Sequence, residues 1–164
     1  MLGALLSALV LWVVSGLATP VPEPVRYGVV VAVAVAGVLR DAGLVRFPLP
    51  QNARQVPQTV LTGDVARGSL QFGFEMGTGV RTYVSSTVPY VLVAALLLTG
   101  PSFVTAVATG VGFGLGRALT PTARYASRDG ETWDVVLHRH LPAIKVVSGL
   151  AVAAALAVLL FVRR

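Results

Sequence analysis

Two charged residues lie in a stretch of the sequence that is otherwise apolar and rich in glycine. They are Glu75 and Arg81, within residues 68–86. An unpaired charge is costly inside a bilayer, so two interpretations stay open. Either the pair forms a polar site at membrane depth that binds an ion or an anionic group or relays a proton, or it anchors the segment at the membrane surface. The residues are six positions apart, so a regular helix does not bring them together, and the first interpretation requires a broken or re-entrant helix.

A second polar group precedes the last apolar run. His138 and His140 flank Arg139, and a His-x-His pair is able to bind a metal ion, but only if further ligands are close. The nearby carboxylates are those of Asp129, Glu131 and Asp134. Because we expect these residues to lie in a loop, we predict no metal site. We interpret the histidines, together with Trp133, as anchors at the membrane surface.

The residue types exclude several classes of chemistry. The sequence has no cysteine, which rules out a disulfide scaffold, a thiol redox centre and a cysteine-bound metal or iron–sulfur cluster. Serine, histidine and aspartate all occur, but no serine stands in a Gly-x-Ser-x-Gly turn or next to a histidine. We therefore expect that the protein is not an enzyme and binds no cofactor.

Glycine recurs at helical spacing in two places. Gly73 and Gly77 form one Gly-x-x-x-Gly pair. A second glycine face consists of Gly110, Gly112, Gly114 and Gly116. Glycines four residues apart let two helix backbones approach closely, so we interpret both sets as packing faces within the chain, with contact to a second chain or a ligand groove as alternatives. Neither is a nucleotide-binding fingerprint, because no strand precedes it and the phosphate-binding lysine or third glycine is missing.

The composition is typical of a membrane protein. Of the 164 residues, 55% are hydrophobic and 12% are charged, and the mean hydropathy is +0.78. Soluble domains average about 25% charged residues, so this chain has too few to cover a surface in water. The 13 Lys and Arg exceed the 7 Asp and Glu, but they stand between and beside apolar runs, as in membrane topology. We therefore expect no nucleic acid among the partners.

The apolar runs predict an all-α integral membrane bundle, with residues 1–164 as a single polytopic domain. A spanning helix needs about 20 mostly apolar residues, and five runs approach that length. The predicted spans are residues 2–18, 27–45, 87–99, 101–119 and 143–162, with residues 68–86 as a broken or re-entrant segment. A cleavable signal peptide is the alternative for the first run, although no basic residue precedes it.

Two long polar segments separate the spans. Residues 46–67 and 120–140 are both predicted to be loops, the first with a short surface helix at residues 59–66. Between the third and fourth spans, Thr99, Gly100, Pro101 and Ser102 predict a tight turn, because Gly-Pro does not continue a helix. We therefore expect these two spans to form an antiparallel hairpin.

The basic residues predict the orientation in the membrane. Nine of them belong to the two polar loops and their edges, whereas three (Arg26, Arg163 and Arg164) fall on the opposite side, and Arg81 is unassigned. The positive-inside rule then predicts cytoplasmic polar loops, an N-terminus inside and a C-terminus outside.

The stretch from Arg67 to Tyr90 resembles small polytopic membrane proteins of high-GC Gram-positive bacteria. More distantly, it is similar to thiol-electron transporters of the CcdA/DsbD type, in which a glycine-rich apolar stretch leads into Cys-x-x-Pro at the start of a transmembrane helix. The matching residues here are Ser86, Thr87, Val88 and Pro89. Ser86 stands in the place of the cysteine, so the resemblance implies a broken-helix scaffold and Ser86 as part of a polar site, but not the disulfide relay.

Together these observations predict a non-enzymatic protein of a bacterial inner membrane. It would be transporter-like or a subunit of a membrane complex, with the lipid bilayer and other membrane-protein subunits as partners. The alternative is a cysteine-free relative of the CcdA/DsbD-type transporters that acts as a partner or assembly factor.

Overall fold

The structure, a computed structural model, describes residues 2–50, 74 and 86–162. These residues contain five α-helices and one 3-10 helix, and no strand, which confirms the all-α prediction. The elements are α1 (Leu2–Val14), η1 (Ser15–Ala18), α2 (Glu23–Asp41), α5 (Val88–Thr99), α6 (Phe103–Ala126) and α7 (Gly130–Val162). The predicted surface helix at residues 59–66 lies outside the described residues, as does nearly all of the segment at residues 68–86.

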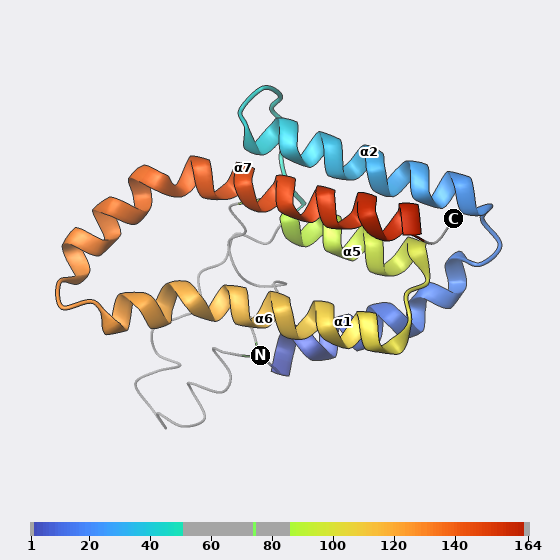
Figure 1. The fold of residues 1–164 in the computed structure, drawn as a ribbon, viewed down its shortest axis with the longest axis horizontal. Coiled ribbons are helices and arrows are strands. Elements are labelled where there is room, and N and C mark those ends of the chain that lie inside the picture. Colours follow the sequence, from blue (N-terminus) through green and yellow to red (C-terminus); the bar gives the residue numbers. More distant parts are fainter. Residues whose placement is uncertain (1, 51–73, 75–85, 163–164) are drawn as a thin grey trace.

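The helices form an elongated bundle in which helices that follow one another in the chain run in opposite directions (Figure 1). α6 packs mainly on α1, while α2 packs on both α5 and α7. The expected hairpin of the third and fourth spans is therefore only partly correct. Gly100, at φ +54°, ends α5 in the left-handed region and reverses the chain as predicted. However, α6 then lies along α1 rather than along α5.

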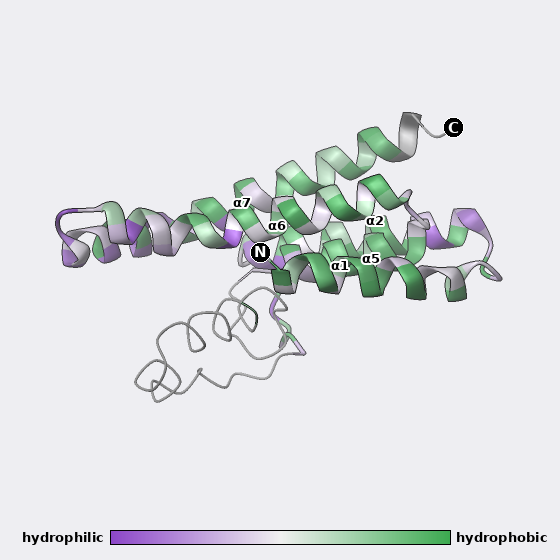
Figure 2. Ribbon diagram, turned by 90° about the horizontal axis from the view of Figure 1, so that it is seen from below, coloured by the Kyte–Doolittle hydropathy of each residue, from purple (hydrophilic) through white to green (hydrophobic). Residues whose placement is uncertain are grey.

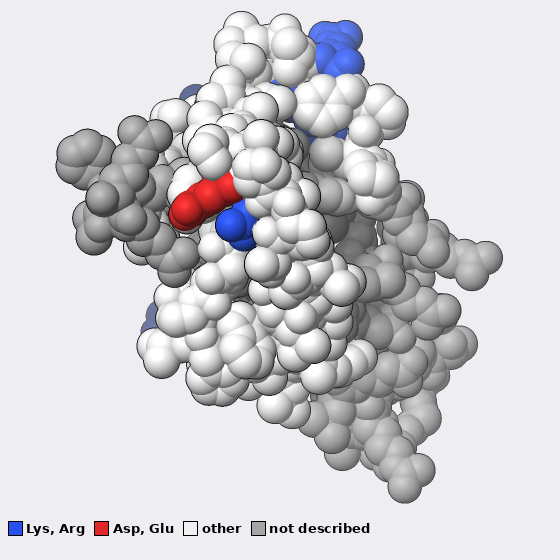
Figure 3. All heavy atoms as spheres, turned by 90° about the vertical axis from the view of Figure 1, so that its right-hand side faces the viewer, with Lys and Arg blue, Asp and Glu red and all other residues white. Residues whose placement is uncertain are grey.

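Two polar contacts fix the end of the bundle that holds this turn. The indole Nε1 of Trp12 donates to the carbonyl of Pro101 at 3.0 Å, and Nη1 of Arg26 donates to the carbonyl of Leu98 at 3.2 Å. The Trp12 ring also meets Phe103 edge to face, with ring centroids 5.4 Å apart. Seen from this end, the surface is mostly uncharged (Figure 3).

The interior of the bundle consists of small residues. Its buried hydrophobic residues are Ala4, Ala8, Val30, Ala34, Val91, Ala95, Leu96 and Ala106. Gly110 lets α6 approach α1 closely, because a Cβ at this position would lie 2.8 Å from the Cβ of Ala8 and 3.1 Å from the Cα of Leu5. The large aliphatic side chains mostly face outward; Val104, for example, is 73% exposed and Val147 is 64% exposed.

Two helices, α6 and α7, are long and apolar enough to cross a membrane, although length and composition are the only basis for this statement. Two of the other predicted spans are shorter apolar helices, at Leu2–Ala18 and Val88–Thr99. The span predicted at residues 27–45 is shifted: α2 begins at Glu23, just after Pro22, and ends at Asp41. It starts early because Pro24 is tolerated in the first helical turn.

The prediction of a polar loop at residues 120–140 is wrong. α6 continues to Ala126 and α7 already begins at Gly130, so only a short turn separates them. Pro121 and Pro142 both lie inside helices, Pro121 in α6 and Pro142 in α7. We call residues 117–142 the polar hairpin, and it extends beyond the apolar part of the bundle (Figure 2).

Candidate functional site

The carboxylate of Asp41 lies where the end of α2 meets the start of α5. Its side chain is only 1% exposed. Oδ2 accepts hydrogen bonds from Ser86 Oγ at 2.9 Å, from the backbone N–H of Thr87 at 2.8 Å and from Thr87 Oγ1 at 2.9 Å. Oδ1 faces Nη1 of Arg40 at 3.3 Å. A single buried carboxylate therefore joins two helices that are distant in the sequence.

The local sequence explains this arrangement. Thr87 is the N-cap residue of α5, but its own side chain does not cap the helix. Asp41 replaces it from α2, and a negative charge at a helix N-terminus is stabilised by the unpaired N–H groups and by the helix dipole. The close approach requires Gly37, because a Cβ at that position would lie 2.8 Å from Thr87 Oγ1. Thr87 itself is buried, at 4% exposure.

A pocket of ≈ 450 Å³ is lined by Asp41, by the chain at and after the end of α2, and by Lys145 of α7. Arg40, Arg46 and Lys145 contribute its basic lining. Arg40 also donates from Nε to the carbonyl of Phe47 at 2.9 Å, and its guanidinium carbon lies 5.6 Å from the centre of the Phe47 ring. The three basic residues give the pocket a lining that can hold an anion.

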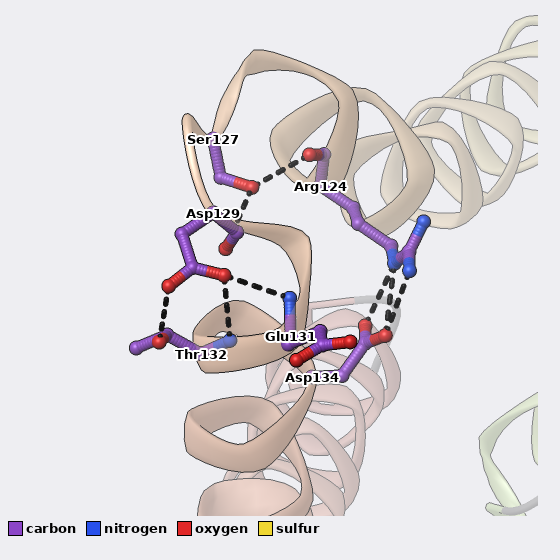
Figure 4. Close-up of polar contacts among 6 residues, drawn as sticks. All are labelled: Arg124, Ser127, Asp129, Glu131, Thr132 and Asp134. Carbon is purple, nitrogen blue, oxygen red and sulfur yellow. Dashed lines mark hydrogen bonds and ion pairs between the residues drawn. The ribbon is translucent and has the colours of Figure 1, made fainter.

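A second polar cluster stabilises the tip of the polar hairpin (Figure 4). Arg124 of α6 donates from Nε to both carboxylate oxygens of Asp134 of α7, at 2.8 and 3.0 Å, and from Nη2 to Oδ2 at 2.9 Å. Asp129 caps α7 by accepting from the backbone N–H of Glu131 at 3.0 Å and of Thr132 at 3.1 Å, and it also accepts from the Thr132 hydroxyl at 2.5 Å. These bonds to Thr132 hold the pKa of Asp129 below its usual value.

The residues suspected of metal binding do not converge. Asp129 and Asp134 are engaged in the hairpin contacts just described, and they lie in or beside helices rather than in a long loop. His140 meets the carbonyl of Val136 at 2.8 Å within its own helix. Among the residues that the structure describes, no group of three potential metal ligands is present. Trp133, expected to face the membrane surface, is half-buried, with its indole nitrogen covered by protein.

The structure relates the other predicted site residues to this geometry in different ways. Ser86 belongs to the Asp41 site, whereas Glu75 and Arg81 lie outside the described residues, as do Gly73 and Gly77. Gly110 and Gly114 are buried, and Gly110 is a close contact of α6 with α1. A Cβ on Gly112 or Gly116 would meet nothing within 4 Å. These two glycines therefore take no part in the close contact with α1, and a role for them between chains stays a prediction.

Sequence reasoning missed Asp41, Thr87 and the grouping of Arg46 with Lys145. The signal for Asp41 was an acidic residue at the end of an apolar run, and the signal for its partners was the Ser86-Thr87 pair just before Pro89. Nothing local connects the two signals, because 45 residues separate Asp41 from Ser86.

Comparison with known proteins supplies no family for this chain. No protein-family model, no curated protein and no solved structure matches it.

Proposed function

We propose that the protein is a non-enzymatic, multi-pass protein of a bacterial inner membrane, and that it works as a subunit of a membrane complex. The observation that carries the proposal is the distribution of side-chain size. Alanine and glycine fill the helix contacts, whereas large aliphatic side chains face outward. In water the opposite arrangement is favoured, because burying large apolar side chains drives folding. In lipid, close backbone packing by small residues drives helix association.

The polar hairpin supports the choice of a subunit. α7 has 33 residues and is therefore about 50 Å long, which exceeds the hydrocarbon core of about 30 Å. The additional length is polar and is held together by the contacts of Arg124 and Asp129. A reinforced helical hairpin that extends from an apolar bundle is suited to contact with another protein.

Membrane integration and complex formation are tested separately. Alkaline carbonate extraction of membranes from expressing cells should leave the protein in the pellet. For the complex, a photo-crosslinking amino acid is placed at Arg128, in the turn of the hairpin, and as a control at Val104, on the outer face of α6. Position 128 should give one discrete protein adduct and position 104 none. A membrane-embedded protein without an adduct at position 128 or elsewhere along the hairpin would contradict the subunit role.

A transporter-like role is the second candidate, and the buried carboxylate of Asp41 supports it. Intramembrane carboxylates commonly mark ion or proton pathways. Asp41→Asn keeps the shape of the side chain and its ability to accept from Ser86 and Thr87. If the chain moves an ion through this site, the variant should reach normal membrane levels and fail to restore growth of a deletion strain. If Asp41→Asn restores growth fully, the transporter-like role is contradicted and the subunit role is retained.

A further inference from the structure

The pocket beside Asp41 has walls of two chemical kinds. Arg40, Arg46 and Lys145 provide cations, and Val45, Phe47 and Pro48 provide apolar surface. Lys145 comes from α7, whereas the other residues belong to α2 and the segment that follows it. The pocket therefore lies between two helices that contact each other along the bundle.

The end of α2 gives the pocket its shape. Gly43, at φ +79°, adopts the left-handed conformation, and its N–H donates to the carbonyl of Arg40 while that of Leu44 donates to the carbonyl of Leu39, both at 2.9 Å. This is the Schellman arrangement, which satisfies the last carbonyls of the helix and reverses the chain. The Arg40 bond to the Phe47 carbonyl then holds the returning segment against the helix.

The charges of the pocket do not cancel. The carboxylate of Asp41 faces Ser86, Thr87 and Arg40, so its charge is already compensated. Neither Arg46 nor Lys145 makes a hydrogen bond or an ion pair with any residue in the part of the chain that the structure describes. Two cations that line the pocket therefore have no anionic partner among the described residues. Two such cations match the charge of a phosphate ester, which guanidinium groups bind in a paired geometry and lysine binds as a point charge.

We propose that this pocket binds the phosphate group of an anionic phosphate ester at the membrane surface. The inference rests on the proposed membrane location, since the pocket lies where the apolar run of α2 ends and where that of α7 begins. At this depth the source of phosphate is the headgroup of an anionic phospholipid, with the apolar wall of Val45 and Phe47 against its glycerol and acyl part. Basic pockets between membrane helices bind such headgroups. A soluble phosphate ester shares the chemistry and is the other source.

Lys145 is the only lysine of the chain, so its amine serves as the reporter. The full-length protein is purified in a neutral detergent, and the rate of acylation at Lys145 is measured by peptide mass spectrometry. Three probes are titrated: dioleoylphosphatidylglycerol, dioleoylphosphatidylcholine and soluble glycerol 1-phosphate. The phosphatidylglycerol should slow acylation at a concentration where the phosphatidylcholine does not.

Two variants that each remove one positive charge make the test specific. Arg46→Gln removes a cation of the pocket, and Arg139→Gln removes an exposed cation of α7 that does not line it. A basic side chain near the surface changes anionic-lipid binding by about five-fold. Arg46→Gln should therefore raise the protecting concentration about five-fold, while Arg139→Gln leaves it unchanged. Arg46 has no partner in the described part of the chain, so its replacement should not disturb folding, which circular dichroism checks.

The three probes distinguish the outcomes. Protection by phosphatidylglycerol alone assigns the site to a lipid headgroup. Equal protection by glycerol 1-phosphate assigns the same site to a soluble ester. Equal effects of both lipids, or an Arg46→Gln protein that behaves like wild type, would overturn the proposal. The soluble probe acts in detergent solution, so it still tests the pocket if carbonate extraction shows that the chain does not integrate into membranes.

Discussion

The side chain of Asp41 connects the end of α2 to the start of α5. Replacement by alanine removes the acceptor for two hydroxyl groups and for the backbone N–H of Thr87, the N-cap residue of α5. Buried donors left without a partner cost about 1–3 kcal/mol each, and some of them will find water. We expect Asp41→Ala to lower the free energy of unfolding in detergent by about 3 kcal/mol. Glu131→Ala, at an exposed position, is the matched control and should change stability by less than about 0.5 kcal/mol. If Asp41→Ala and Glu131→Ala unfold with the same free energy, Asp41 does not stabilise the start of α5.

Two glycines of α6 give opposite expectations for the same substitution. A Cβ at position 110 would lie 3.1 Å from the Cα of Leu5 and 3.2 Å from the carbonyl oxygen of Ala4, both backbone atoms of α1. Gly110→Ala should therefore push α1 and α6 apart and destabilise the bundle by about 1–3 kcal/mol. Gly112 faces open space, so Gly112→Ala should stabilise the helix by up to about 1 kcal/mol. Denaturation in one detergent measures both, and a shift of the same sign in both variants would contradict the assignment.

At the scale of elements, the polar hairpin depends on a capped helix start. The pKa of Asp129 is lowered from its ordinary value of 3.8, first by the side-chain bond to Thr132 and then by the backbone bond. A depressed folded-state pKa means that the capping contribution is complete above pH 3.8 and is lost as the pH falls through the lower, folded value. Amide resonances of Glu131 and Thr132 in micelles should therefore shift only below about pH 4. Asp129→Asn retains an acceptor oxygen and should remove this pH dependence. If the variant titrates like wild type, another group is responsible.

Element positions could be predicted wherever an apolar run ends at a strong breaker. The segment from Thr19 to Pro22 separates η1 from α2, and Gly100-Pro101 lies between α5 and α6, as the sequence indicates. The hairpin could not be predicted this way, because polar composition together with Pro121 and Pro142 is also typical of a loop. Two contacts stabilise the helical form of the hairpin: the Arg124–Asp134 ion pair and the cap that Asp129 forms on α7. Neither contact can be recognised from the sequence alone. The Asp41 site depends on a contact between distant segments and had no local signature.

At the scale of the whole molecule, the ends of the bundle differ in charge. The end of α2, where the basic residues of the pocket gather, and the polar hairpin lie toward one end, whereas η1 and the α5–α6 turn lie toward the other (Figure 1). The positive-inside rule then predicts that the basic end faces the cytoplasm. The sequence has no cysteine, so single cysteines can be introduced without background. Cysteines at positions 47 and 128 should react only with a membrane-permeant maleimide in intact cells, and a cysteine at position 19 should also react with an impermeant one. Labelling of positions 47 and 128 from opposite sides would refute this topology.

The length of α7 has a consequence for anything that the hairpin contacts. Residues 130–142 precede its apolar part and raise the turn about 20 Å above it. Because both arms are helical and are joined by the ion pair of Arg124 and Asp134, the height of the turn varies less than that of an irregular loop. In the proposed membrane location, a molecule bound at the turn is confined to a thin layer parallel to the bilayer. Its search for a second membrane-bound target becomes two-dimensional, and only targets whose own binding surface stands at the same height are within reach.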